Sequence, residues 1–161
     1  MPLVSGLLRF IGVMNAAIWF GAAVFTFLGA CPALTTSPGV EQLLGSKFFP
    51  YYSVALAQLI LSRFFVFYMI CSAVALVHLL AEWLYFGKYP SRLWLLLLFS
   101  LCLAGLFQSF WLQPRLAEWH RAGAVRPYMT WRSVSNAVNV ALLCGLGLYL
   151  WRVGSPPPRR G

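Results

Sequence analysis

Long stretches without a single charged side chain are the feature that most constrains this sequence. They cover residues 10–40, 48–62, 64–81, 93–114 and 133–151. A helix needs about 20 predominantly apolar residues to cross the hydrocarbon core of a bilayer. Four of the five stretches approach or exceed that length, so the sequence predicts four membrane spans, at about residues 10–34, 64–86, 93–114 and 133–151.

The composition agrees with a membrane protein. Of 161 residues, 61% are hydrophobic and only 9% are charged, whereas a soluble domain averages about 25% charged residues. Lipid cannot satisfy open backbone groups, and the apolar stretches lack the alternation of barrel strands, which leaves helices. We therefore expect an all-α fold, a single four-helix transmembrane bundle over residues 1–152, followed by a disordered, basic, Pro-rich tail at 153–161.

The second uncharged stretch, residues 48–62, is too short to be a span of its own. At 1.5 Å per residue it would cover only about 22 Å. We expect it to form either an extra helix lying at the membrane interface or an extension that lengthens the second span.

A candidate cleavage site lies in the first stretch. The residues Leu28-Gly29-Ala30-Cys31 resemble the site at which a bacterial lipoprotein signal is cut and its cysteine lipidated. However, Arg9 is the only charge before this stretch, whereas a secretory signal has a basic start and a short apolar core. We interpret residues 10–34 as a retained helix, which Pro32 and the turn residues after it bring to an end.

The basic residues do not decide the orientation. The chain has a net charge of +9, and no basic stripe interleaved with exposed aromatic residues indicates nucleic-acid binding. In a four-span bundle six basic residues would lie on each side: Arg9, Lys88, Arg92, Arg152, Arg159 and Arg160 on the terminal side, and Lys47, Arg63, Arg115, Arg121, Arg126 and Arg132 on the other. The basic tail suits a surface of anionic lipid, so we expect both termini in the cytoplasm, in a bacterial inner membrane.

Sequence motifs for catalysis are missing. The four cysteines form no CxxC pair, and the sequence contains no metal-ligand cluster, phosphate-binding loop, dinucleotide fingerprint or catalytic triad. We therefore expect a protein that is not an enzyme, and the missing ligand clusters argue against a redox enzyme in particular.

Several polar residues fall inside the expected spans, where they usually face the bundle interior. Asn15 and Trp19 lie four residues apart, as do Ser135 and Asn139, so each pair shares one helix face; Gln108 lies in the third span. Two interpretations follow. These residues either form hydrogen bonds between helices or line a polar cavity that holds a ligand or passes a solute.

His78 is the other unusual residue, because it lies deep in the second span with Glu82 one helical turn later. One interpretation is a hydrogen bond to Glu82, to a neighbouring helix or to a backbone carbonyl. The other is cofactor binding: a neutral imidazole can ligate the metal of a tetrapyrrole, with the carboxylate orienting its ring. The residues Phe64, Phe65, Phe67 and Tyr68 would form flat walls for such a pigment or for a carotenoid.

The third helix is expected to continue beyond the membrane and to kink at Pro114. In this extension Glu118 lies between two arginines at helical spacing and could pair with both. We predict either a solvated helix end or a surface for docking a partner or lipid headgroup, formed by Arg115, Trp119, Arg121 and Trp131.

Four short motifs resemble those of the transmembrane-protein-205-like family, small four-helix membrane proteins with a domain of unknown function. "AAIWFGAAVFTFLGACPAL" is similar to the family's first helix, and "FFPYY" to its entry into the second. "WLQPRL" resembles the end of its third helix, and "RSVSNAVN" its fourth. Arg132 stands where many members carry His, and residues 50–88 are longer than the usual second helix. The resemblance implies a membrane fold and no particular chemistry.

These features leave two classes of function. The first is a non-enzymatic accessory or structural subunit of a larger membrane complex, in contact with lipids and pigments of the chlorophyll or carotenoid type. Its partners would be other membrane subunits or further copies of the chain. The alternative is a small transporter or channel-like protein, which would need a continuous polar path between the helices.

Overall fold

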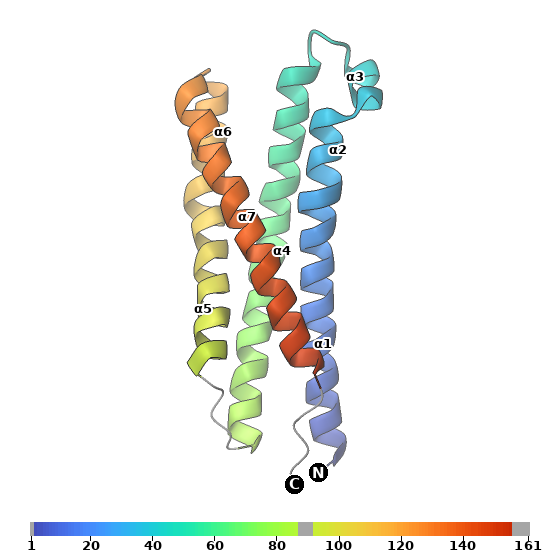
Figure 1. The fold of residues 1–161 in the computed structure, drawn as a ribbon, viewed down its shortest axis with the longest axis vertical. Helices are drawn as coiled ribbons and strands as arrows, with labels where there is room; N and C mark the ends of the chain where they lie inside the picture. The colour runs from blue at the N-terminus through green and yellow to red at the C-terminus, as the bar shows by residue number, and fades with distance from the viewer. Residues whose placement is uncertain (1, 87–91, 156–161) are drawn as a thin grey trace.

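The computed structural model describes residues 2–86 and 92–155, and these are almost entirely helical (Figure 1). The elements in chain order are α1 (Pro2–Val24), η1 (Phe25–Ala30), α2 (Cys31–Thr36), α3 (Pro38–Leu44), α4 (Phe49–Phe86), α5 (Arg92–Leu106), η2 (Phe107–Leu112), α6 (Gln113–Arg121) and α7 (Val125–Gly154). The two η segments are π-helical. The expected tail at 153–161 lies mostly outside the described residues.

Four continuous helical rods are long and apolar enough to cross a membrane: Gly6–Thr36, Tyr51–Tyr85, Arg92–Arg121 and Val125–Gly154. Figure 1 shows three of them running side by side, with α7 crossing obliquely in front and both termini at one end. This confirms the expected fold class. The protein is an all-α, integral membrane four-helix bundle.

The second rod begins earlier than the expected 64–86, because residues 48–62 belong almost wholly to α4. Of the two alternatives, the structure therefore shows the extended helix and no separate interfacial one. At about 1.5 Å per residue the 38 residues of α4 span roughly 57 Å, well beyond the hydrocarbon core. Arg63 does not interrupt this helix, because a single exposed arginine can extend its apolar stem along the helix and keep its charge near water.

Pro32 does not end the first rod, contrary to the expectation from sequence. The chain stays helical through Thr36 and breaks only at Ser37, whose ψ is 124°. A proline has no N–H and crowds the carbonyl four residues earlier, which normally breaks a helix. Here a π turn ends two residues before the proline, and the N–H of Cys31 bonds to the carbonyl of Thr26, five residues back. The short helix α3 that follows was not expected.

The same arrangement recurs at Pro114 in the third rod. The π segment η2 ends at Leu112, and the N–H of Gln113 donates to the carbonyl of Gln108, again five residues back. Helix α6 then continues to Arg121, as expected. Both membrane prolines are thus accommodated by one wide helical turn placed directly before them.

Aromatic residues fill the middle of the bundle. Trp19 and Tyr68 are fully buried and meet edge to face, with ring centroids 4.7 Å apart, and Tyr149 approaches Trp19 from α7 at 6.1 Å. Glycine makes room for these rings: Gly105 of α5 lies directly against the ring of Tyr68. Small residues at such contacts let membrane helices approach closely.

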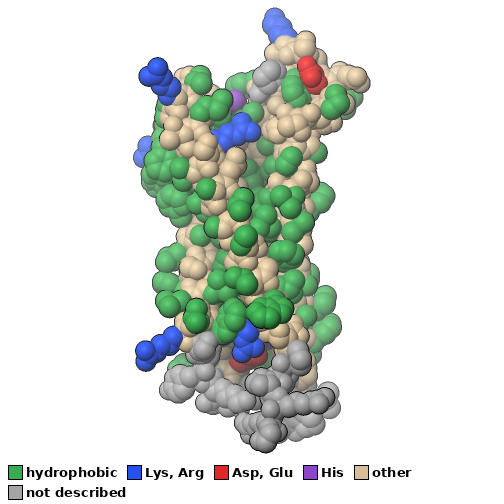
Figure 2. All heavy atoms as spheres, in the orientation of Figure 1, with side chains coloured by type: hydrophobic (Ala, Val, Ile, Leu, Met, Phe, Trp, Pro, Cys, Tyr) green, Lys and Arg blue, Asp and Glu red, His purple; other side chains and the backbone are tan. Residues whose placement is uncertain are grey.

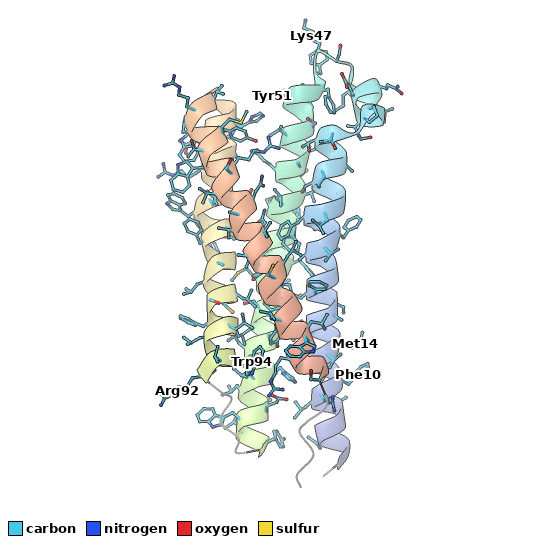
Figure 3. The ribbon with its side chains drawn as sticks, viewed as in Figure 1. Phe10, Met14, Lys47, Tyr51, Arg92 and Trp94 are labelled. Carbon is cyan, nitrogen blue, oxygen red and sulfur yellow. The ribbon has the colours of Figure 1, made fainter. Side chains whose placement is uncertain are left out.

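The charged and apolar side chains are distributed as a bilayer requires. Apolar side chains cover the middle of the visible face in Figure 2, and Lys and Arg lie toward its ends. Figure 3 shows Lys47 and Tyr51 at one end and Arg92 and Trp94 toward the other. At the terminal end Arg9 donates hydrogen bonds to the carbonyls of Gly154 and Ser155, at 3.2 and 3.1 Å, which ties the first rod to the carboxyl end of α7.

Cysteine labelling tests this topology. In a background with the four native cysteines replaced by alanine, Gly6→Cys and Gly154→Cys should react with a membrane-impermeant maleimide from one side of the membrane. Ser46→Cys and Ala122→Cys should react from the opposite side. Labelling of Gly6→Cys and Gly154→Cys from different sides would contradict the four-rod arrangement.

The packing at Gly105 predicts a stability difference. A Cβ at this position would overlap the ring of Tyr68, so Gly105→Ala should lower the free energy of unfolding by about 1–3 kcal/mol, measured as thermal unfolding in detergent. Gly21→Ala is the matched control, because no heavy atom lies within 4 Å of its added Cβ, and alanine favours a helix by up to ~1 kcal/mol. An equal decrease in the free energy of unfolding in both variants would contradict a tight contact between Gly105 and the ring of Tyr68.

Candidate functional site

A network of buried polar side chains joins the third and fourth rods. The Gln108 side chain is fully buried and donates from Nε2 to Asn139 Oδ1 at 2.9 Å and to the Ser135 carbonyl at 3.1 Å. Its Oε1 accepts from Ser135 Oγ at 3.2 Å and from Gln113 Nε2 at 3.3 Å. All of the ordinary hydrogen-bonding capacity of this amide is therefore used, which is what allows it to be buried.

Three members of the network, Gln108, Ser135 and Asn139, were singled out from the sequence, but Gln113 was missed. Gln113 follows Gln108 by five residues, a spacing that does not share a face in an α-helix. The π turn of η2 brings the two together. The signal that could have found Gln113 is its place directly before Pro114, since a wide turn is one way for a helix to continue past a proline.

A pocket of ≈ 300 Å³ lies beside this network, between the end of the first rod, α4, α6 and α7. Its size is at the lower limit of pockets that hold small molecules. The polar lining residues are Thr35, Thr36, Gln58, Gln113, Tyr128, Arg132, Ser135, Asn136 and Asn139. The apolar ones include Phe27, Leu28, Val54, Leu61, Leu116, Val140 and Leu143.

The pocket is open toward the surface that faces lipid. Leu28 and Val140 line it from opposite rods and are 67% and 60% exposed. In Figure 1 α7 leans away from α2 at the end opposite the termini, with α4 visible behind them. A molecule dissolved in the membrane could thus enter from the side.

Aromatic rings and a histidine lie at this end of the bundle, where α4, α6 and α7 come together. His120 stacks on Tyr51, with ring centroids 5.0 Å apart, and its ring lies 5.4 Å from that of Tyr128. The guanidinium carbon of Arg132 lies 6.0 Å from the Tyr128 ring centroid. Two buried nitrogens here have no hydrogen-bond partner among the described residues, Nε2 of His120 and Nε2 of Gln58.

Asn15 and Trp19 face the bundle interior but do not join the polar network. Asn15 donates to the carbonyl of Cys71 at 3.0 Å and thereby links α1 to α4. Trp19 is fully buried, and its Nε1 has no partner among the described residues. Asn15 thus links the first two rods, and Trp19 packs between the first, second and fourth.

His78 forms a hydrogen bond through Nε2 to the carbonyl of Leu8, at 2.9 Å. A carbonyl only accepts, so Nε2 carries the proton, and ligation through this nitrogen would require the bond to break. Glu82 Oε1 lies 3.9 Å away, and Gly12 leaves room for the imidazole ring. This geometry agrees with the hydrogen-bonding interpretation, whereas ligation of a tetrapyrrole by His78 stays a prediction.

The expected pigment walls belong to the packed core. Phe64 and Phe65 are buried against each other and against Phe27, at centroid distances of 5.0–6.3 Å, and Tyr68 contacts Trp19. Their flat faces are therefore occupied by neighbouring side chains.

The expected docking residues lie on the outside of α6 and the start of α7. Trp119 stacks on Trp131 at 6.1 Å, and Trp131 meets Trp111 edge to face at 5.0 Å. Arg115 and Arg121 are exposed, and Arg121 donates to the carbonyl of Ala117. The expected pairing of Glu118 with these arginines is wrong, because neither Arg115 nor Arg121 lies within 4.0 Å of a carboxylate in the described part of the chain.

Within residues 2–86 and 92–155, no group of three or more His, Cys, Asp or Glu residues could hold a metal ion. Comparison with protein-family models, curated proteins and solved structures found no match for this chain. The pocket and its polar network are therefore the basis for a functional assignment.

The network predicts different effects for two neighbouring asparagines. Asn139→Leu removes a bond to Gln108 and should lower the free energy of unfolding by about 1 kcal/mol, seen as a lower melting temperature in detergent. Asn136→Leu is the control, because Asn136 is exposed and no hydrogen bond of its side chain is found among the described residues. Equal melting temperatures for both variants would show that the network does not stabilise the bundle.

Proposed function

We propose that this protein is a non-enzymatic membrane protein that holds a small amphipathic molecule in the pocket between its four rods. The observation that carries this proposal is the pocket itself. It combines apolar walls with hydrogen-bonding side chains and opens between rods that face lipid. Apolar pockets with a few convergent polar groups are the usual form of a small-molecule site.

The surroundings of the pocket favour binding over catalysis. The polar side chains that line it are mainly amides and hydroxyls, with one guanidinium and the thiol of Cys31, and its described lining includes no carboxylate or imidazole. Amides and hydroxyls orient a ligand, but general acid–base chemistry needs a group that gains and loses a proton near neutral pH. The lining residues thus suit recognition.

In the membrane such a protein would act as an accessory subunit of a larger complex, alongside other membrane proteins or further copies of itself. This role is supported by the small mass outside the spans and by the many large apolar side chains exposed along all four rods. We propose a bacterial inner membrane as its location, with both termini in the cytoplasm. A pigment contact through His78 belongs to the same proposal, and an absorption spectrum of the protein purified with its partners would test it.

A small transporter is the second candidate. Polar side chains lie on both sides of the aromatic layer: the Gln108 network on one side, and Asn15 and His78 on the other. The fully buried rings of Trp19 and Tyr68 separate them, so a solute would pass only if this layer opened. Solute uptake into liposomes that contain the protein would favour this candidate.

Filling the pocket should remove the ligand. We expect protein purified in mild detergent to carry a co-purifying amphipathic molecule, seen by native mass spectrometry and by chemical identification of the organic extract. Leu143→Trp places a bulky ring on the pocket wall, where it would clash with the bound molecule. Such a clash costs ~1–3 kcal/mol, so the fraction of protein that carries the ligand should fall by about tenfold.

The matched control is Leu148→Trp, which places the same ring on a lipid-facing position of the same helix, 51% exposed. It should retain the ligand. Melting temperatures of both variants show whether each is folded. A folded Leu143→Trp variant that carries as much ligand as the unmodified protein would contradict the pocket as the binding site.

A further inference from the structure

Arg132 brings a positive charge to the pocket wall, two turns into α7. The chain has three acidic residues in all, Glu41, Glu82 and Glu118, and none forms a salt bridge with Arg132. Its contact among the described residues is the ring of Tyr128, at 6.0 Å. A guanidinium that lies partly within a membrane protein is costly unless an anion or water offsets its charge.

The polarity of the pocket changes along its length. At the end near the α6–α7 connection its lining includes Thr35, Thr36 and Arg132. Toward the middle of the bundle the lining is mainly apolar, with Phe27, Leu61 and Leu143 beside the amide of Asn139. From Arg132 to Leu143 the distance along the helix is about 16 Å at 1.5 Å per residue.

A second polar group in the pocket lacks a partner. Nε2 of Gln58, on α4, is buried and makes no hydrogen bond with any described residue. This amide nitrogen donates only, as does the guanidinium of Arg132. Gln58 on α4 and Arg132 on α7 thus both line the pocket without an acceptor for these donors among the described residues, and the accessible guanidinium suits a ligand that brings oxygen acceptors.

We propose that the pocket binds an acidic amphiphile with a single apolar chain, whose carboxylate or phosphate oxygens pair with Arg132 while its chain lies between Phe27 and Leu143. This inference rests on the proposed function and names the class of its ligand. Arginine presents a planar fork of donors that matches both acidic groups, and charged hydrogen bonds of this kind are about twice as strong as neutral ones. The ligand enters from the bilayer, past the exposed rim of Leu28 and Val140.

A neutral or cationic amphiphile fits these observations less well. A cation would meet Arg132 with no carboxylate nearby to compensate, because Glu41, Glu82 and Glu118 do not line the pocket. A neutral headgroup would leave the guanidinium without a counter-charge. The limited volume, ≈ 300 Å³, favours one chain over two.

Photocrosslinking tests the proposal. The full chain is placed in nanodiscs of phosphatidylcholine and exposed to two probes of equal chain length, a diazirine analogue of palmitate and the corresponding fatty alcohol. We expect the palmitate probe to label peptides from Phe27 to Thr36 and around Leu143, and to be displaced by unlabelled palmitate or lysophosphatidate. The alcohol should label the same peptides at least tenfold less, because it cannot form the charged hydrogen bond to Arg132. A bond of this kind contributes ~1.5 kcal/mol or more, which corresponds to a tenfold change in affinity.

Variants assign the effect to one side chain. Arg132→Gln should reduce labelling by the palmitate probe about tenfold and leave labelling by the alcohol unchanged, and Arg132→Lys should restore part of it. Arg126→Gln is the matched control, because it removes an exposed arginine from the same helix outside the pocket.

The outcomes separate this inference from the proposed function. Equal labelling of the pocket by both probes, unaffected by Arg132→Gln in a variant of normal melting temperature, would overturn the acidic headgroup and leave a pocket for amphiphiles. No labelling of the pocket by either probe, together with a purified protein that carries no ligand, would overturn both.

Discussion

Peptide groups in hydrocarbon have no solvent to bond with, and this constraint governs every other feature of the structure. It forces the chain into helices whose N–H and carbonyl groups satisfy each other. It also decides how the chain passes its two membrane prolines, since each removes one donor from a place where water cannot replace it. The π turns at Phe25–Ala30 and Phe107–Leu112 solve this problem by bonding to carbonyls five residues back. The π turn at Phe107–Leu112 also contributes to the polar network, because it brings the side chains of Gln108 and Gln113 within hydrogen-bonding distance.

The same constraint explains why the polar residues of the bundle collect in a few places. Gln108 is buried completely and still has two donors and an oxygen to satisfy, so Ser135, Asn139 and Gln113 surround it. Where no such set is present, aromatic and small residues fill the interior, as in the contact of Trp19, Tyr68 and Gly105. The pocket forms at the boundary between these two kinds of packing, which is why its wall is part amide and part hydrocarbon.

The sequence was sufficient to predict the number of spans, because the length of an uncharged stretch is a direct response to bilayer thickness. It was also sufficient to predict that Ser135 and Asn139 lie on one inward face of the fourth helix, since four residues make about one helical turn. It left open whether residues 48–62 lengthen the second span, because the charge of Arg63 also suited a boundary, and it failed at Pro32, where the expected end was bridged by a π turn. A polar cavity lined by Ser135 and Asn139 was one of two interpretations, but the position and opening of the pocket could not be predicted. It depends on the lean of α7 away from α2, and no local pattern of residues records the angle between two helices.

The π turns have a further consequence for the register of the rods. An α-helix turns by about 100° per residue, so the extra residue held in a wide turn rotates everything that follows relative to everything before it. In the first rod an unbroken α-helix would turn Cys31 about 120° away from Trp19, and the wide turn removes most of this difference, so that both side chains face α4. In the first and third rods the wide turn thus resets which side chains of the following helix face lipid. A chain shortened by one residue in Phe25–Ala30 would keep its length across the bilayer almost unchanged, yet present a different set of side chains to the cavity.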